Sequence, residues 1–448
     1  MTSEDHRQRL QNFADMHAML GDMPWQAVRD YIPGQVVYNL SEYPVATPLG
    51  PNEYDAELLG MFAGEGVGLI QIHEDWNDSQ RVLGADKFSS PDPEGLQRFV
   101  DLVHSLGMKI IPYISTGYFD VKDPDFRDSW HDPQRGRLIE LYFDYAHCSP
   151  SSPEWRAYLL PRLEQVLDQY GFDGLYNDMG YARHLDGQPV LEGQVRPAPH
   201  THAAMEDLLS IVYEMVKHRG GIVKCHGCPP ECTERMRVYD YLWVGEAVKS
   251  LEKLRDDSRN LQPYLSPCPD MSRAEVVDEH ELYLYTIPYL QFPLRVDGRP
   301  VTGERAVAPG VVYPPEEKCF WTRHMRAIRK LYLEHPEGPY NYGWWDSSPG
   351  RPQARDLWFD YLRLYRPMVE NQSRAWVEVG PTPLFKWRLP EKVTATFYVN
   401  TETYLVLANF GDQAAVVDSL WEWENRRTGE KTSKITLQSH QLAFLKRV

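Results

Sequence analysis

The sequence lacks an apolar run long enough to cross a membrane, and it lacks an excess of basic residues. No stretch of about 18 consecutive apolar residues occurs, so we expect no membrane-spanning helix. Lys and Arg together number 47 against 64 Asp and Glu, which gives a net charge of −17. Because a chain this acidic repels phosphate backbones and anionic lipids, we exclude general binding to nucleic acids or membranes.

Cysteine is also sparse, with six residues in a chain of 448. The N-terminal residues 1–6 are polar and acidic, without the basic and apolar stretches of a secretory signal. We therefore expect free thiols and a cytoplasmic location. Cys225, Cys228 and Cys232 surround His226 and could bind zinc, but the second pair of ligands that would close such a site is missing. We predict no metal site.

Short apolar runs alternate with amphipathic segments between about residue 25 and residue 370. Strands are expected at residues 36–40, 67–73, 108–114, 172–176, 221–225, 241–244, 282–290 and 339–345. Helices are expected at residues 5–20, 52–62, 91–106, 153–170, 204–218, 231–237, 317–333 and 353–369. This α/β alternation favours a (β/α)8 TIM barrel over an open doubly wound sheet. No glycine-rich dinucleotide or phosphate fingerprint follows an early strand, so no cofactor is predicted.

The pattern changes after about residue 372, where short strands follow one another. They are expected at residues 394–399, 404–410, 414–417, 434–437 and 441–445. We predict a small C-terminal all-β sandwich. The expected domains are an N-terminal helical segment (1–24), the barrel (25–371) and the sandwich (372–448).

Polar and aromatic side chains gather where the expected barrel strands end, which is where a barrel of this kind places its reacting groups. Carboxylates can bind sugar hydroxyls and a flat ring can cover the apolar face of a sugar, although ordinary packing also explains aromatic side chains. The candidate substrate-binding residues are His73, Glu74, Asp75, Trp76, Tyr113, Asp144, Tyr176, His226, Trp345 and Asp346.

Two carboxylates follow apolar strands and are the candidate catalytic pair. Asp178 comes at the end of the expected fourth strand, whereas Asp173 lies at its opposite end and is interpreted as structural. Glu246 follows the expected sixth strand, and the preceding Gly245 permits a close approach of the backbone. Asp240 is the second choice for this role, because it lies near the far end of the same strand.

The segment Phe172–Met179, with the sequence FDGLYNDM, resembles the nucleophile segment of retaining α-glycosidases with (β/α)8 barrels. Glycoside hydrolase family 31 has a similar pattern, D-G-F-W-x-D-M-N-E, but here Gly180 and Tyr181 replace the Asn and Glu that end it. Families 36, 101 and 129 place an Asp nucleophile similarly. Because families 31 and 36 use an Asp as acid and families 101 and 129 a Glu, the pair Asp178 and Glu246 is most similar to the α-N-acetylgalactosaminidase families 101 and 129.

The resemblance implies a retaining glycoside hydrolase that cleaves α-glycosidic bonds by double displacement, with an α-N-acetylgalactosaminide-like saccharide as substrate. Asp178 would be the nucleophile and Glu246 the acid and base, with their carboxyl groups about 5–5.5 Å apart. The alternatives are an α-galactosidase or α-glucosidase of the same mechanism, and a carbohydrate-binding barrel without catalysis. A metal-dependent hydrolase that uses the Cys/His cluster is a further alternative.

Overall fold

The computed structural model describes residues 2–40, 48–72, 76–77, 88–121, 123–132, 137–140, 143–178, 199–226, 238–245, 250–258, 264–268, 279–299 and 352–448. The chain divides into two compact units. The barrel unit comprises Gln35–Glu246 and Leu294–Pro352, and the sheet unit comprises Met1–Gly34, Ala247–Pro293 and Gln353–Val448. Within the described ranges, no helix is both long enough and apolar enough to cross a membrane.

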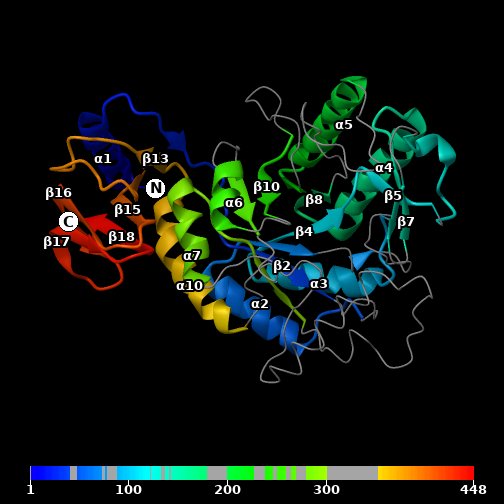
Figure 1. Cartoon of the computed structure of the whole chain (residues 1–448). Coiled ribbons are helices and arrows are strands. Elements are labelled where there is room, and N and C mark those ends of the chain that lie inside the picture. Colours follow the sequence, from blue (N-terminus) through cyan, green and yellow to red (C-terminus); the bar gives the residue numbers. More distant parts are fainter. Residues whose placement is uncertain are drawn as a thin grey trace. The chain divides into compact units, whose positions relative to one another are not determined.

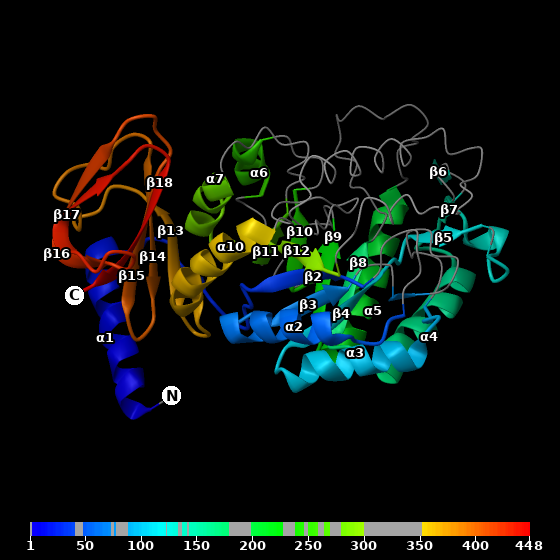
Figure 2. The same ribbon diagram turned by 90° about the horizontal axis from the view of Figure 1, so that it is seen from below.

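The barrel unit is built on parallel strands with helices between them (Figures 1 and 2). In sheet order its strands are β10 (Tyr241–Val244), β9 (Ile222–His226), β8 (Gly174–Asp178), β4 (Lys109–Ile114), β3 (Leu69–Ile72), β2 (Gln35–Asn39) and β12 (Arg295–Gly298). Its helices are α2 (Glu53–Glu65), α3 (Pro93–Ser105), α4 (Pro153–Tyr170) and α5 (Pro199–His218). The excursion after β4 holds β5 (Tyr118–Asp120), β6 (Leu138–Glu140) and β7 (Phe143–His147). The parallel sheet has eight strands when β11 (Tyr264–Pro267) is included, which confirms the expected (β/α)8 type of fold.

Side chains on the two faces of this sheet have different neighbours. Tyr38 in β2 donates a hydrogen bond to Asp55 of α2 and its ring contacts Phe99 of α3, so its face meets the helices. On the opposite face, Nζ of Lys224 in β9 lies 3.0 Å from Oε1 of Gln35 in β2. Three strands separate β9 from β2 in the sheet order, so this contact requires the sheet to curl around the face that bears Lys224 and Gln35.

Helix α4 covers the range 153–170 that the sequence predicts, and local signals set its two ends. The Ser152 hydroxyl caps the helix by accepting a hydrogen bond from the backbone N–H of Trp155, and Pro153 occupies the first turn. Gly171 then ends the helix with φ of 69°, a left-handed conformation that glycine adopts without steric cost. Because β8 begins three residues later, these caps place the start of the strand that carries Asp178.

The strand expected at residues 282–290 is wrong. The structure has helix α7 (Glu279–Leu284) and a 3-10 turn (Ile287–Tyr289) there. Tyr283 stacks on Tyr361 of α10 (Pro352–Tyr365), with ring centroids 3.8 Å apart, so the apolar residues serve a helix–helix contact. A short apolar run cannot distinguish a strand from a buried helix by periodicity alone. The strands β11 and β12 were not expected, while the predicted elements at 231–237, 317–333 and 339–345 lie outside the described residues.

The sheet unit contains an antiparallel sheet in its C-terminal part, in agreement with the predicted change of fold. The sheet order is β1 (Gln26–Ala27), β13 (Arg374–Val379), β14 (Val393–Val399), β15 (Thr403–Asn409), β18 (Gln441–Arg447), β16 (Ala415–Asn425) and β17 (Lys431–Leu437). The unit also holds α1 (Ser3–Leu20), α6 (Leu251–Ser258), α7, β11 and α10. The expected boundaries at 24/25 and 371/372 stay predictions, because the two units are each assembled from separate stretches of the chain.

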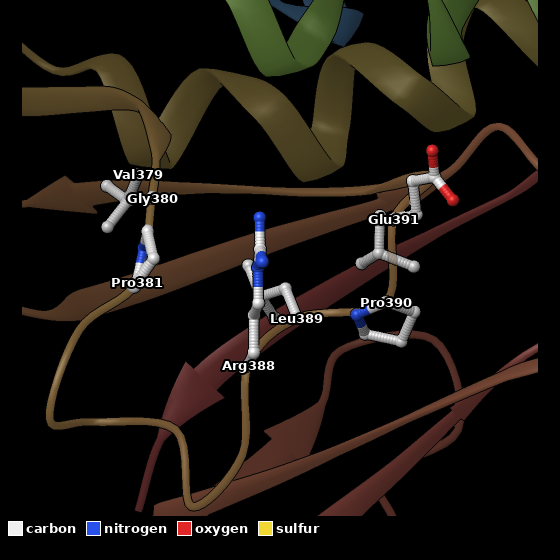
Figure 3. Close-up of a pocket in the computed structure, with 8 residues that line it drawn as sticks. Val379, Gly380, Pro381, Arg388, Leu389, Pro390 and Glu391 are labelled. Carbon is white, nitrogen blue, oxygen red and sulfur yellow. The ribbon is translucent and has the colours of Figure 1, made fainter.

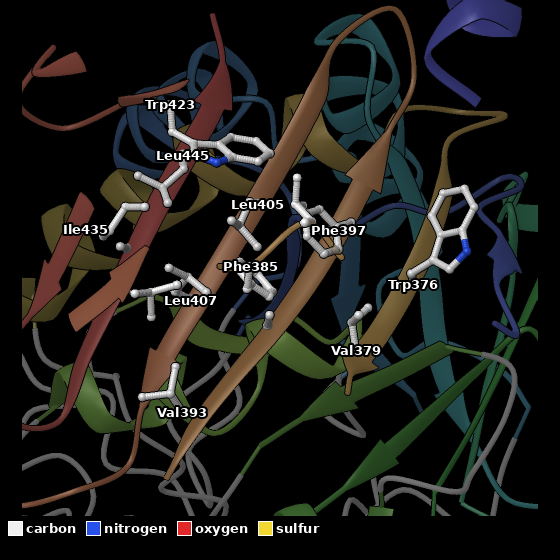
Figure 4. Packing of buried hydrophobic residues seen from close by; sticks show 14 of the residues in the cluster. Trp376, Val379, Phe385, Val393, Phe397, Leu405, Leu407, Trp423, Ile435 and Leu445 are labelled. Atoms are coloured by element: carbon white, nitrogen blue, oxygen red, sulfur yellow. The ribbon is translucent and has the colours of Figure 1, made fainter. Parts of the chain in front are cut away.

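One face of the antiparallel sheet carries a continuous apolar core (Figure 4). Trp376 in β13, Phe397 in β14 and Trp423 in β16 are fully buried within it. Met16 and Leu20 of α1 belong to the same cluster, so the N-terminal helix packs with the last strands of the chain. Arg447 in β18 pairs with Asp15 of α1 at 2.7 Å. Apolar burial of this kind is the main source of stability for the sheet, whose central strands β14 and β15 are buried on both faces.

The inner face of the barrel sheet contains one polar side chain whose removal should stabilise the protein. Gln71 of β3 is fully buried, and neither its Oε1 nor its Nε2 has a hydrogen-bond partner among the described residues. We expect Gln71→Met to raise the free energy of unfolding by about 1–2 kcal/mol, since an unpaired buried amide is costly.

Gln35→Met is the matched control for this measurement in chemical denaturation. It removes the acceptor that lies 3.0 Å from the buried ammonium of Lys224, so we expect a loss of about 2 kcal/mol or more. A loss of stability in Gln71→Met comparable to that in Gln35→Met would contradict the prediction.

Candidate active site

Asp178 lies at the carboxyl end of β8, and side chains from two neighbouring strands hold its carboxylate. The hydroxyl of Tyr113 in β4 donates a hydrogen bond to Oδ2 at 3.0 Å. Nδ1 of His226, the last residue of β9, lies 3.7 Å from Oδ1. The side chain of Asp178 keeps 23% of its surface exposed. The carboxylate is therefore oriented from two sides and still accessible, as a nucleophile must be.

An aromatic cluster supports these groups on the inner face of the sheet. The ring of Tyr176 stacks on that of Trp243 in β10, with centroids 5.2 Å apart. The Trp243 ring also lies 5.3 Å from His226, and Tyr113 meets Tyr176 edge-on at 5.8 Å. Below them, the buried ammonium of Lys224 lies 5.8 Å from the Trp243 ring centroid. These rigid side chains fix the positions of Tyr113 and His226.

The loop after β4 ties the end of β8 in place. Asn177 is buried, and its amide group exchanges hydrogen bonds with the hydroxyl and backbone N–H of Thr116 at 3.1–3.2 Å. The indole of Trp155 in α4 donates to the backbone carbonyl of Thr116 at 3.0 Å. Because Asn177 and Asp178 are adjacent and alternate across the strand, fixing one side chain restricts the backbone that carries the other.

Among the predicted site residues, the structure brings together Asp178, Tyr113, Tyr176 and His226. Their lateral register explains this arrangement, since Tyr113 pairs with Tyr176 and Asp178 pairs with His226 in neighbouring parallel strands. The candidates His73, Glu74, Asp75, Glu246, Trp345 and Asp346 lie outside the described residues, as does the side chain of Asp144. Their roles stay predictions.

Trp76 has a different environment from these four residues. Its ring is fully buried and packs edge-on against Tyr170 and Phe172, with centroids 5.9 and 5.8 Å away. Its indole N–H donates to the backbone carbonyl of Tyr113 at 2.8 Å. These contacts are those of a packing residue that supports β4. The prediction that Trp76 binds substrate is therefore wrong, because its ring is fully buried.

Two other aspartates of the barrel are anchored at the amino ends of strands. Asp173 accepts a hydrogen bond from the backbone N–H of Ile110 and lies 2.8 Å from Nε2 of His104, which confirms its structural interpretation. Asp240 precedes β10 and binds Lys217, the hydroxyl of Tyr213 and the backbone N–H of Val223. Because Asp178 lies at the opposite, carboxyl end, Asp240 is ruled out as the second choice for the acid.

Only part of the cysteine cluster is described, so the prediction that it holds no metal stays a prediction. Cys225 is fully buried, while Cys228 and Cys232 lie outside the described residues. The described residues contain no group of three His, Cys, Asp or Glu side chains arranged to hold a metal ion.

Sequence reasoning missed Trp243 and Lys224 as parts of the site. Along each strand, every second side chain points towards the inner face of the sheet. Trp243 and Lys224 lie on this inner face together with His226 and Tyr176. The alternation of side chains along β9 and β10 predicts which residues share a face. Only the register between the strands shows which of these residues are neighbours.

Comparison with solved structures shows the same architecture in enzymes that process α-glycosides. A family 36 α-galactosidase variant from Geobacillus stearothermophilus, in complex with 1-deoxygalactonojirimycin, is 12% identical with a TM-score of 0.54. The alignment covers 94% of this chain but 56% of the α-galactosidase, so the chain spans little more than half of that protein's length.

Two further structures match over nearly their full length. Trehalose-6-phosphate hydrolase from Bacillus licheniformis is 10% identical, with a TM-score of 0.57, and covers 93% of this chain and 99% of its own. Trehalulose synthase from Pseudomonas mesoacidophila is 13% identical, with a TM-score of 0.55, and covers 92% and 98%.

No family model and no curated protein matches the sequence. The similarity to these solved structures is one of fold, at 10–13% sequence identity.

Proposed function

We propose that this protein is a retaining α-glycoside hydrolase with Asp178 as its nucleophile. The observation that carries the proposal is the carboxylate of Asp178 at the carboxyl end of β8, bound by Tyr113, adjacent to His226 and partly exposed. The carboxyl ends of the strands are where (β/α)8 enzymes place their reacting groups. The fold shared with α-galactosidase and trehalose-6-phosphate hydrolase supports the same reaction class.

In the proposed reaction, an oxygen of Asp178 attacks the anomeric carbon as the bond to the leaving oxygen breaks. The product of this step is a glycosyl ester of Asp178, and a water molecule then displaces the carboxylate. Tyr113 donates a hydrogen bond to Oδ2, and His226 lies beside Oδ1, which is the oxygen that attacks in this proposal. The two displacements together preserve the anomeric configuration.

Glu246 remains the proposed acid and base, which protonates the leaving oxygen and later deprotonates water. It follows β10 by two residues in the sequence, and β10 pairs with the strand that carries His226. Carboxyl groups about 5–5.5 Å apart would fit retention, and about 6.5–9.5 Å would fit inversion.

The proposed substrates are short oligosaccharides with an α-linked terminal sugar, cleaved in the cytoplasm. The combination of Asp178 with Glu246 favours α-N-acetylgalactosaminides, whereas the solved neighbours include an α-galactosidase bound to stachyose and an α-amylase bound to acarbose. Chromogenic α-N-acetylgalactosaminide, α-galactoside and α-glucoside therefore form the first substrate panel, with the β-anomers as controls.

Replacing the nucleophile tests the mechanism directly. We expect Asp178→Ala to lower kcat by about 10⁴-fold or more, because the covalent step loses its attacking group. Added azide should then restore turnover by direct displacement and give a glycosyl azide with the inverted, β configuration, which NMR identifies.

The matched carboxylate control is Asp168→Asn, at an exposed position on α4 paired with Arg219, and it should keep full activity. Near-normal turnover by Asp178→Ala, or an azide product of retained configuration, would contradict the assignment.

Tyr113 should act as a positioning residue for Asp178. We expect Tyr113→Phe to lower kcat by about 10–100-fold with little change in KM, since the hydroxyl contacts the carboxylate. The acid limb of the profile of kcat/KM against pH should move to higher pH, because the ionised carboxylate loses a hydrogen bond. Tyr158→Phe, which removes a hydrogen bond to Asp125 in the excursion after β4, should leave this limb in place. An unshifted acid limb in Tyr113→Phe would refute the role.

A further inference from the structure

The C-terminal sheet carries a surface hollow of about 540 Å³ (Figure 3). It is formed at the end of β13, in the segment that leads to β14 and at the start of β14. Its lining residues are Val379, Gly380, Pro381, Arg388, Leu389, Pro390, Glu391 and Val393. The volume is in the range of small-molecule sites, and polar and apolar groups contribute to the lining in similar amounts.

The segment that borders this hollow is firmly anchored. Leu384 and Phe385 are buried in the core of the sheet. The backbone of Leu384 accepts a hydrogen bond from the N–H of Leu420, and the N–H of Lys386 donates to the carbonyl of Asp418. The hydroxyl of Thr382 donates to the carbonyl of Met19 at 3.0 Å. Because the segment is held at several points, its exposed side chains are presented from a preformed surface.

Trp387 follows these anchors directly and is 74% exposed, the largest fraction among the exposed large apolar side chains of the described residues. An indole in water carries a free-energy cost that a packed position would avoid. Leu384 and Phe385, three and two residues before Trp387, are the side chains of this segment that pack in the core of the sheet. Trp387 therefore offers a flat apolar ring to solvent, and it directly precedes Arg388, which lines the hollow.

Two side chains of opposite charge, Arg388 and Glu391, line the hollow. Figure 3 shows the side chain of Arg388 standing between the Val379–Pro381 stretch and the side of the hollow formed by Pro390 and Glu391. Both Arg388 and Glu391 are exposed, and neither makes a hydrogen bond or ion pair within the described part of the chain. A guanidinium and a carboxylate can each bind two neighbouring hydroxyl groups.

The charge balance favours a neutral ligand. Arg388 and Glu391 are the charged residues that line the hollow, and their charges offset each other, while Glu378, Lys386 and Lys392 flank the lining residues in the sequence. The backbone also bends here. The register between β13 and β14 shifts between Trp376 and Val379, and Glu378 has φ of 49°. Such bulges change the direction of a strand, and this one directly precedes Val379, the first residue that lines the hollow.

From these observations we propose that the C-terminal sheet binds a neutral oligosaccharide at this hollow. Trp387 stacks on the apolar face of one sugar ring, and Arg388 and Glu391 hydrogen-bond its hydroxyl groups. This saccharide-binding surface belongs to the sheet unit, whereas Asp178 belongs to the barrel unit. It adds a binding activity that the proposed hydrolysis does not require, and so it can be tested independently.

Affinity electrophoresis of the full chain tests the proposal in native gels that contain soluble starch or guar galactomannan. Asp178→Asn serves as the parent protein, so that the polysaccharide stays intact. We expect at least one polysaccharide to retard the parent. Adding Trp387→Ala or Arg388→Ala should weaken apparent binding about tenfold, the loss expected for a stacking contact or a charged hydrogen bond. Trp387→Tyr should retain most of the binding, because it keeps a ring.

The control Val416→Ala changes another exposed apolar residue of the same sheet and should bind like the parent. Turnover of small chromogenic α-glycosides by Trp387→Ala in the otherwise native chain should equal that of the native chain. Free migration of the parent in both gels, or equal retardation of Trp387→Ala, would overturn the proposal. Trp387-dependent retardation without any glycoside turnover would uphold this surface and refute the proposed hydrolase.

Discussion

The parallel pairing of β8 with β9 and of β9 with β10 is the constraint on which the candidate site depends. In this register Asp178 lies beside His226, and His226 lies beside Trp243. The pairing of β4 with β8 places Tyr113 beside Tyr176, one inward position before Asp178. A shift of one residue in any of these pairs would turn the side chains of one strand towards the helices. The side chains around Asp178 would then no longer be in contact.

Aspartates at the two ends of these strands have different environments. Asp173 and Asp240 lie before β8 and β10, where backbone N–H groups and neighbouring side chains satisfy their carboxylates. Asp178 lies at the carboxyl end, where it keeps an exposed part and has orienting groups on each oxygen. Aspartates therefore stabilise the barrel at the amino ends of the strands, whereas Asp178, at the carboxyl end of its strand, remains available for chemistry.

In the sheet unit, too, a buried core holds the segment that presents an exposed side chain. Its core buries aromatic residues from several strands, together with Met16 and Leu20 from the N-terminal helix. That core anchors the segment between β13 and β14 closely enough for Trp387 to stay exposed beside Arg388. A rigid support allows an apolar ring to remain in water, where a flexible segment would fold it against the surface.

The sequence by itself determined the local elements and the type of fold. Capping by Ser152, the stop at Gly171 and the apolar strand that follows predicted both α4 and the position of Asp178, because these signals act within a few residues. The sequence could not identify the helix at residues 279–284, where an apolar run fits either element. The partnership of Asp178 with Tyr113 and His226, the burial of Trp76 and the exposure of Trp387 were decided by tertiary structure, since each depends on residues far apart in the chain.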